Sequence, residues 1–170
     1  MLPKNYLVFK WFVYAIATFF LCLLQSMVLD NIRVLGLTPF FYPMLPAMVA
    51  MFEGPKQGGG FALAVGLLCD LLLPAPFPGF FTIAFAVGAI LSGSLAGRLA
   101  SKGFVCALIV SALGLLATCA LRLMVQILLG GQYLALMARI ALGETLLTLP
   151  MTAVALPIYR AIAKRCASDY

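Results

Sequence analysis

Residues 104–129, FVCALIVSALGLLATCALRLMVQILL, form the longest of the apolar runs in the chain, and Arg122 is their only charged residue. A helix crosses the hydrocarbon core of a bilayer with about 20 consecutive apolar residues. This run is long enough to do so, and it is therefore predicted to be a transmembrane helix.

The composition of the whole chain indicates the same class of protein. Of its 170 residues, 65% are hydrophobic and 9% are charged, and the mean hydropathy is +1.14. Soluble domains carry about 25% charged residues. A soluble fold of this length is too small to hide so much apolar surface, because small domains leave a large share of their surface in water.

Five further apolar runs divide the rest of the chain. The first follows a basic start, but it is too long for a signal peptide and lacks an A-x-A cleavage site, so we expect it to be retained. The second contains Pro43 and Pro46. The second and third runs are short, and we expect them to be tilted or re-entrant and sheltered by other helices. The predicted helices, in one polytopic membrane domain over residues 1–170, are 11–29, 37–52, 59–73, 80–99, 104–129 and 140–159.

Basic residues gather on one side of these predicted helices. With six spans and both termini inside, eight lysines and arginines lie inside and three lie outside, as the positive-inside rule requires. A five-span arrangement would leave one short run unused and place the basic C-terminus outside, so it ranks second. This pattern accounts for the net charge of +6, and nucleic acid is not an expected partner. The inside set is Lys4, Lys10, Lys56, Arg98, Lys102, Arg160, Lys164 and Arg165, and the outside set is Arg33, Arg122 and Arg139.

Four polar residues lie inside the predicted helices, toward their outer ends: Gln25, Asp70, Arg122 and Glu144. A polar group in hydrocarbon is costly, so each of them calls for a partner or a role. Arg122 is expected to pair with Asp70 or Glu144, or else to reach the outer interface, as Asp70 would. Glu144 is shorter and deeper, which favours a partner there.

Small residues mark two of the predicted helices. They let helix backbones approach closely in a membrane, so we expect the small-residue face of the fourth run to pack within the chain or to receive a partner helix. The fourth run contributes Gly88, Ser92, Gly93, Ala96, Gly97 and Ala100, and the glycine-rich third run contributes Gly59, Gly60 and Gly66.

Residue patterns of common catalytic sites are missing from the sequence. It contains no histidine and no G-x-S-x-G motif, and its five cysteines have no CxxC spacing, so neither a disulfide framework nor a metal site is expected. Residues 58–60 are three glycines, but the Gly-Lys-Ser/Thr of a phosphate loop does not follow them. We therefore expect no enzyme, no metal and no cofactor.

The order of these features resembles the MreD family of bacterial rod-shape membrane proteins. The family's mark is a glycine-rich apolar helix that closes in G-L-x-x-D, as residues 66–70, GLLCD, do here. A first helix ending in Leu24-Gln25, a proline-containing run around 39–46 and a turn at Pro78-Gly79 add to the resemblance, which covers roughly residues 5–160.

The resemblance implies six transmembrane helices, in a fold similar to the substrate-binding subunits of energy-coupling-factor transporters. It also implies a non-catalytic subunit of the cell-shape complex (the elongasome) in the bacterial inner membrane. Such a subunit binds an MreC-like scaffold and helps to regulate peptidoglycan synthesis by RodA and a class B penicillin-binding protein.

The alternative is a vitamin-binding subunit of such a transporter. Those subunits typically carry an A-x-x-x-A face on the first helix, whereas here Phe19 follows Ala15 and Leu21 follows Ala17 at that spacing. A channel or a flippase is less expected, because a pore needs a polar lining through the whole membrane, whereas the intramembrane polar residues gather toward one leaflet.

Overall fold

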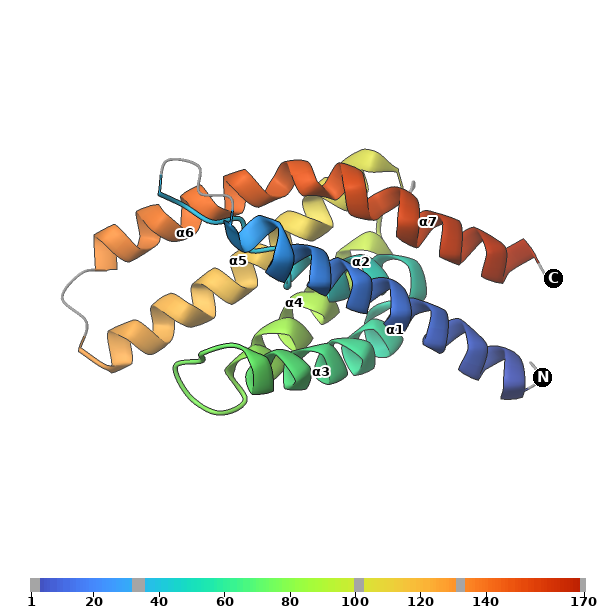
Figure 1. The fold of residues 1–170 in the computed structure, drawn as a ribbon, viewed down its shortest axis with the longest axis horizontal. Helices are drawn as coiled ribbons and strands as arrows, with labels where there is room; N and C mark the ends of the chain where they lie inside the picture. Colours follow the sequence, from blue (N-terminus) through green and yellow to red (C-terminus); the bar gives the residue numbers. More distant parts are fainter. Residues whose placement is uncertain (1–3, 32–35, 100–102, 131–133, 169–170) are drawn as a thin grey trace.

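A computed structural model describes residues 4–31, 36–99, 103–130 and 134–168, and this part of the chain is all helical, without a β-strand. The elements in chain order (Figure 1) are α1 (Lys4–Met27), the short 3-10 helix η1 (Leu29–Asn31), α2 (Met44–Glu53), α3 (Pro55–Leu72), α4 (Phe80–Ala96), α5 (Phe104–Leu128), α6 (Leu134–Thr148), the 3-10 helix η2 (Leu149–Met151) and α7 (Thr152–Ser168).

Three segments of the described chain are long and apolar enough to cross a bilayer. They are Val8–Met27 in α1, Phe104–Leu128, which is α5, and Ala135–Arg165, which runs through α6, η2 and α7. The helices α2 and α4 are apolar but shorter. An all-helical chain with membrane-spanning segments agrees with the class predicted from composition.

Both chain termini lie at one end of the bundle, on the right in Figure 1. The corner between α2 and α3 lies at the same end, beside the last turns of α4, since a Cβ atom at Gly93 would come within 2.9 Å of Pro55. The turn from α3 to α4, the end of α5 and the start of α6 lie at the opposite end. We call these the termini end and the distal end.

The short helix α2 is the buried centre of the bundle. Residues 44–51 are all buried, and α2 contacts α3, α4, α5 and α7. The predicted helix over 37–52 is wrong in its first part, because residues 37–43 are not helical. Pro39 and Pro43 explain the late start, since a proline lacks a backbone donor and disfavours helix in the residue before it. Pro46 falls in the first turn, where a proline is tolerated.

A sharp corner at Gly54 joins α2 to α3. Gly54 has φ 91°, a conformation that side chains disfavour. Pro55 follows as the first residue of α3, where its fixed φ suits a helix start. As a result α3 begins at Pro55 and not at the predicted residue 59, and α2 continues through Glu53 to the corner.

The outer predicted helices also differ in their bounds. The first begins at Lys4 and ends at Met27, against the predicted 11–29, and α4 ends at Ala96, before the predicted 99. The last prediction, 140–159, covers only the middle of a longer unit that begins at Leu134 and ends at Ser168. That unit changes to 3-10 geometry around Pro150, because proline interrupts the regular hydrogen-bond ladder.

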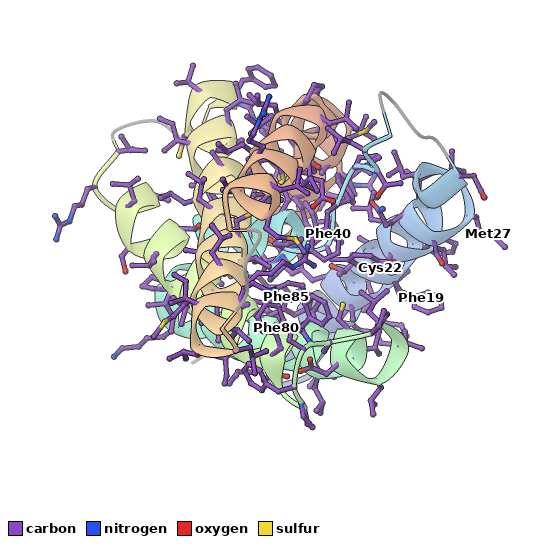
Figure 2. All side chains as sticks on the ribbon, turned by 90° about the vertical axis from the view of Figure 1, so that its left-hand side faces the viewer. Phe19, Cys22, Met27, Phe40, Phe80 and Phe85 are labelled. Atoms are coloured by element: carbon purple, nitrogen blue, oxygen red, sulfur yellow. The ribbon has the colours of Figure 1, made fainter. Side chains whose placement is uncertain are left out.

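Apolar side chains cover the outside of the bundle as well as its core. Phe19 and Met27 of α1 are 55% and 74% exposed, whereas Phe80 and Phe85 are 0% and 1% exposed (Figure 2). Among the described residues, every α-helix except α2 carries large hydrophobic side chains that are exposed. A water-soluble monomer rarely shows so continuous an apolar surface, and contact with lipid accounts for it.

Candidate functional site

Gln25 joins α1 to the non-helical segment that leads into α2. Its side chain is fully buried. The Nε2 atom donates a hydrogen bond to the carbonyl oxygen of Pro39 at 2.7 Å, and Oε1 accepts one from the backbone N–H of Phe41 at 3.1 Å. The N–H of Phe40 donates to Thr148 Oγ1 at 2.9 Å. Side chains of the bundle thus satisfy backbone groups that no helix satisfies, as a low-dielectric interior requires.

Asp70 holds the start of α4. Its carboxylate accepts hydrogen bonds from the N–H of Phe81 at 2.9 Å, from the N–H of Thr82 at 3.0 Å and from the Thr82 hydroxyl at 2.6 Å. The residue at the N-cap position of α4 is Gly79, which has no side chain to do this. A carboxylate from another helix therefore satisfies donors that the first turn of α4 leaves free.

Arg122 lies beside Glu144. The Nη1 and Oε2 atoms are 3.8 Å apart, and the two side chains are 41% and 20% exposed. The guanidinium also stands over the ring of Phe40, 5.5 Å from its centroid, at a distance typical of a cation–π contact. Of the two carboxylates considered as partners for Arg122, Glu144 is the one beside it, while Asp70 binds α4 instead.

Two glycines of α4 lie against other parts of the chain. A Cβ atom at Gly88 would come within 3.3 Å of the Cα atom of Gly114 in α5. A Cβ atom at Gly93 would come within 2.9 Å of the Cα atom of Pro55. Both positions therefore serve close packing of helices inside this chain, which was one of the two expected roles.

The other small residues of α4 are more varied. The Ser92 hydroxyl donates to the carbonyl oxygen of Val110 in α5 at 3.0 Å, and Ala96 is buried. Gly97 follows the end of α4 and is exposed. Ala100 lies outside the described residues, as do Arg33 and Lys102 of the predicted charge pattern. The buried members of this set present no open face to a partner.

The glycines predicted in the third helix also differ from one another. A Cβ atom at Gly66 would lie 2.5 Å from the Cα atom of Thr82, and one at Gly59 would lie 3.1 Å from the Ile90 side chain. Gly60 is exposed and has nothing within 4 Å of that position. Gly58, which was not predicted to be a packing residue, is the tightest, since a Cβ atom there would lie 2.3 Å from the Cα atom of Ala50.

A polar cluster at the termini end was missed from the sequence. Lys10 of α1 forms an ion pair with Glu53 at the end of α2, and the Tyr14 hydroxyl donates to the other carboxylate oxygen at 2.9 Å. The side chain of Glu53 is only 9% exposed. The sequence offered one signal for this contact. Glu53 follows the second apolar run, on the side of the membrane where Lys10 is also predicted to lie.

These contacts belong to a polar stripe on α1, made of Lys10, Tyr14, Thr18 and Gln25. Because an α-helix has 3.6 residues per turn, these positions fall within an arc of roughly 80° around the helix axis. Thr18 shares a hydrogen bond of 2.9 Å with the hydroxyl of Tyr159 in α7. The stripe therefore joins α1 to α2, to α7 and to residues 39–41. These contacts fix the position of α1 along its neighbours.

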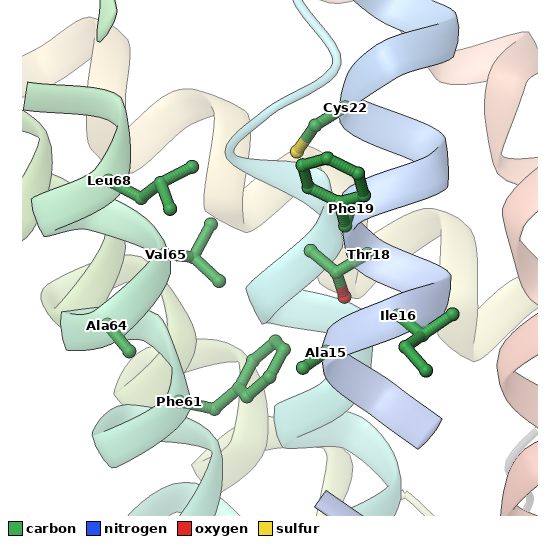
Figure 3. A pocket seen from close by; sticks show the side chains of 9 residues that line it. All are labelled: Ala15, Ile16, Thr18, Phe19, Cys22, Phe61, Ala64, Val65 and Leu68. Carbon is green, nitrogen blue, oxygen red and sulfur yellow. The ribbon is translucent and has the colours of Figure 1, made fainter. Parts of the chain in front are cut away.

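A groove lies between α1 and α3 (Figure 3), with a volume of about 350 Å³. Its α1 wall includes Ala15, Phe19 and Cys22, and its α3 wall includes Ala64 and Leu68. At the termini end of this interface the rings of Trp11 and Phe61 stack at 5.9 Å. The two helices thus meet at that end and leave apolar surface open beyond it.

A second hollow, of about 300 Å³, lies at the distal end between the α3–α4 turn, α5 and α6. Arg122 and Gln126 contribute its polar side chains, and Pro74, Pro76, Leu123 and Met137 contribute apolar surface. We call it the distal recess. In the part of the chain that the structure describes, no group of three or more His, Cys, Asp or Glu side chains is placed to hold a metal ion.

The fold and these contacts define a class: a helical protein with membrane-spanning segments, an apolar exterior and polar clusters at its two ends. In comparisons with known proteins, no family model, no curated protein and no solved structure matches the chain.

Proposed function

We propose that this protein is a six-span, non-catalytic subunit of the bacterial cell-shape complex, as its resemblance to the MreD family implies. It binds an MreC-like scaffold in the inner membrane and helps to regulate peptidoglycan synthesis by RodA and its class B penicillin-binding partner. The fold is then similar to that of energy-coupling-factor substrate-binding subunits.

The distribution of charge supports six crossings with both termini in the cytoplasm. Consecutive helical segments run back and forth between the two ends of the bundle (Figure 1). The termini end holds Lys10, Lys56 and Arg98, and the last turns of α7 add Arg160, Lys164 and Arg165. Under the positive-inside rule this end faces the cytoplasm.

Reporter fusions test this orientation. A periplasm-dependent reporter fused after Tyr170 is expected to be inactive, and the same reporter fused after Pro76, in the α3–α4 turn, is expected to be active. The opposite result at both positions would reverse the orientation, and activity at both would exclude the odd number of spans proposed between them.

The single observation that carries the scaffold role is the position of α1. Only 22% of the residues in the apolar stretch of α1 are buried, against 39% of those in α5. The contact between α1 and α3 leaves the groove open. In lipid, helices associate by close packing and polar contacts, since hydrophobicity gives no advantage there. The exposed alanines Ala15 and Ala64 on the two walls suit the close approach of a partner's transmembrane helix.

Copurification with a tagged MreC-like protein tests this role. The variants Ala15→Leu and Ala64→Leu, which fill the groove from either wall, are expected to lower the recovered partner several-fold. Ala120→Leu is the matched control, since Ala120 is also exposed but lies on α5, away from the groove. Depletion of the protein is expected to round rod-shaped cells. Normal rods together with no copurification would exclude the role.

A further inference from the structure

The distal recess contains two polar side chains with unused hydrogen-bond donors. Arg122 and Gln126 are four residues apart on α5, so they lie one above the other on the same face. Among the described residues, neither side chain forms a hydrogen bond with another group of the chain. A guanidinium carries five N–H donors and an amide two, and the 3.8 Å contact with Glu144 leaves these donors available.

The rest of the recess offers apolar surface and few competing donors. Pro74 and Pro76 form one wall, and a proline has no backbone N–H. Leu123 of α5 and Met137 of α6 add hydrocarbon. Pro74, Pro76 and Met137 are exposed, so the recess opens at the surface of the bundle. Its volume of about 300 Å³ is at the lower end of the range for small-molecule sites.

The depth of the recess matches that of lipid headgroups. The helix α5 has 25 residues, whereas the hydrocarbon core needs about 20. Arg122 lies six residues before Leu128, the last residue of α5, which is about 9 Å along the axis. Its long side chain therefore ends near the boundary between acyl chains and headgroups, where snorkelling arginines lie.

We propose that the distal recess binds a phospholipid, with its phosphate held by Arg122 and Gln126 and its glycerol and upper acyl chain lying over Leu123 and Met137. The ligand chemistry is that of an amphipathic phosphate ester. Glu144 remains beside Arg122 and limits the strength of the site, since a second anion there shares the guanidinium. This site depends on the membrane position of α5 and α6, and it is independent of any role in cell shape.

Lipid binding is measured on the full chain in detergent micelles, by native mass spectrometry with dioleoyl-phosphatidylglycerol and with dioleoylglycerol, which has the same chains and no phosphate. We expect phosphatidylglycerol to bind at least tenfold more tightly. Gln126→Leu, which leaves the Arg122–Glu144 pair intact, is expected to weaken it about fivefold, and Arg122→Gln more. Arg139→Gln is the matched control, an exposed arginine on α6 that does not line the recess, and it is expected to bind as the parent does.

Several outcomes would overturn the site. They are equal binding of the two lipids, an equal loss in Arg139→Gln, or full binding in Gln126→Leu and in the charge-neutral double variant Arg122→Gln/Glu144→Gln. If inorganic phosphate alone binds as tightly as phosphatidylglycerol does, the recess is a site for a free anion and not for a lipid. Displacement of the lipid by a vitamin at equal concentration would assign it to a transporter-like ligand. Loss of MreC copurification affects none of these readouts, so the two proposals fail separately.

Discussion

Gly66 of α3 lies so close to Thr82 of α4 that a Cβ atom added at Gly66 would be 2.5 Å from the Cα atom of Thr82. The same atom would lie 2.8 Å from the carbonyl oxygen of Phe81. These neighbours are backbone atoms, which do not move aside as a flexible side chain does. Four residues later in α3, Asp70 binds the same two residues of α4.

The variant Gly66→Ala is therefore expected to lower the free energy of unfolding by about 1–3 kcal/mol, the usual cost of overpacking a tight contact. Gly60→Ala is the matched control on the same helix, because nothing lies within 4 Å of its added methyl group. Alanine at an exposed helical position is expected to stabilise by up to about 1 kcal/mol. Unfolding in mixed micelles with increasing denaturing detergent measures both, and equal stability of the two variants would contradict the contact.

Asp70→Ala is expected to destabilise the protein by about 0.5–2 kcal/mol, the usual cost of losing a helix cap. The loss comes from the unsatisfied donors of Phe81 and Thr82 at the start of α4. Thr82→Val removes one of the same hydrogen bonds, so the double variant is expected to lose less than the sum of the single losses. Leu71→Ala, at a side chain 81% exposed, serves as the control. Strict additivity would show that the Thr82 hydroxyl does not bind Asp70, and a loss in Asp70→Ala no larger than in Leu71→Ala would show that the cap is absent.

Exchanging the charges of Arg122 and Glu144 tests which carboxylate pairs with the arginine. Each single reversal is expected to place like charges together and destabilise the distal end, and Arg122→Glu/Glu144→Arg is expected to recover part of the loss. The coupling should be modest, about 0.5–1 kcal/mol, because both side chains are partly exposed and screened. Recovery by Arg122→Asp/Asp70→Arg in place of this exchange would show that the arginine pairs with Asp70.

Lys10→Met is expected to cost about 1–3 kcal/mol, because it leaves the carboxylate of Glu53, 9% exposed, without its cation. Glu53→Gln in the same chain is expected to restore part of the loss by removing the unpaired charge. Lys56→Met is the matched control, an exposed lysine three residues from Glu53. Unfolding in denaturing detergent measures the stability of all these variants. If Lys56→Met is as unstable as Lys10→Met, the loss comes from the change in net charge and not from the ion pair with Glu53.

Much of the helical order could be predicted because it is written in local signals. The start of α5 at Phe104 follows from the onset of its apolar run, and the turn before α4 follows from prolines and Gly79. The start of α2 was predicted at residue 37, although its prolines were recognised, because the apolar run begins there and hydropathy does not distinguish helical from non-helical residues. Pro39 and Pro43 decided that case, since proline disfavours helix in the residue before it, and the tertiary structure then buries residues 44–51 inside the protein.

The sequence by itself determined the membrane class, the helical character and the need of Gln25, Asp70, Arg122 and Glu144 for a polar partner or an interfacial position, since hydropathy and the cost of a buried polar group are properties of single segments. Only the tertiary structure decided what those partners are. Asp70 caps α4, Arg122 meets Glu144, and Lys10 meets Glu53, 43 residues away. Such pairs depend on how the helices pack side by side. The hydrophobic periodicity of one helix does not indicate which face of a neighbouring helix it will contact.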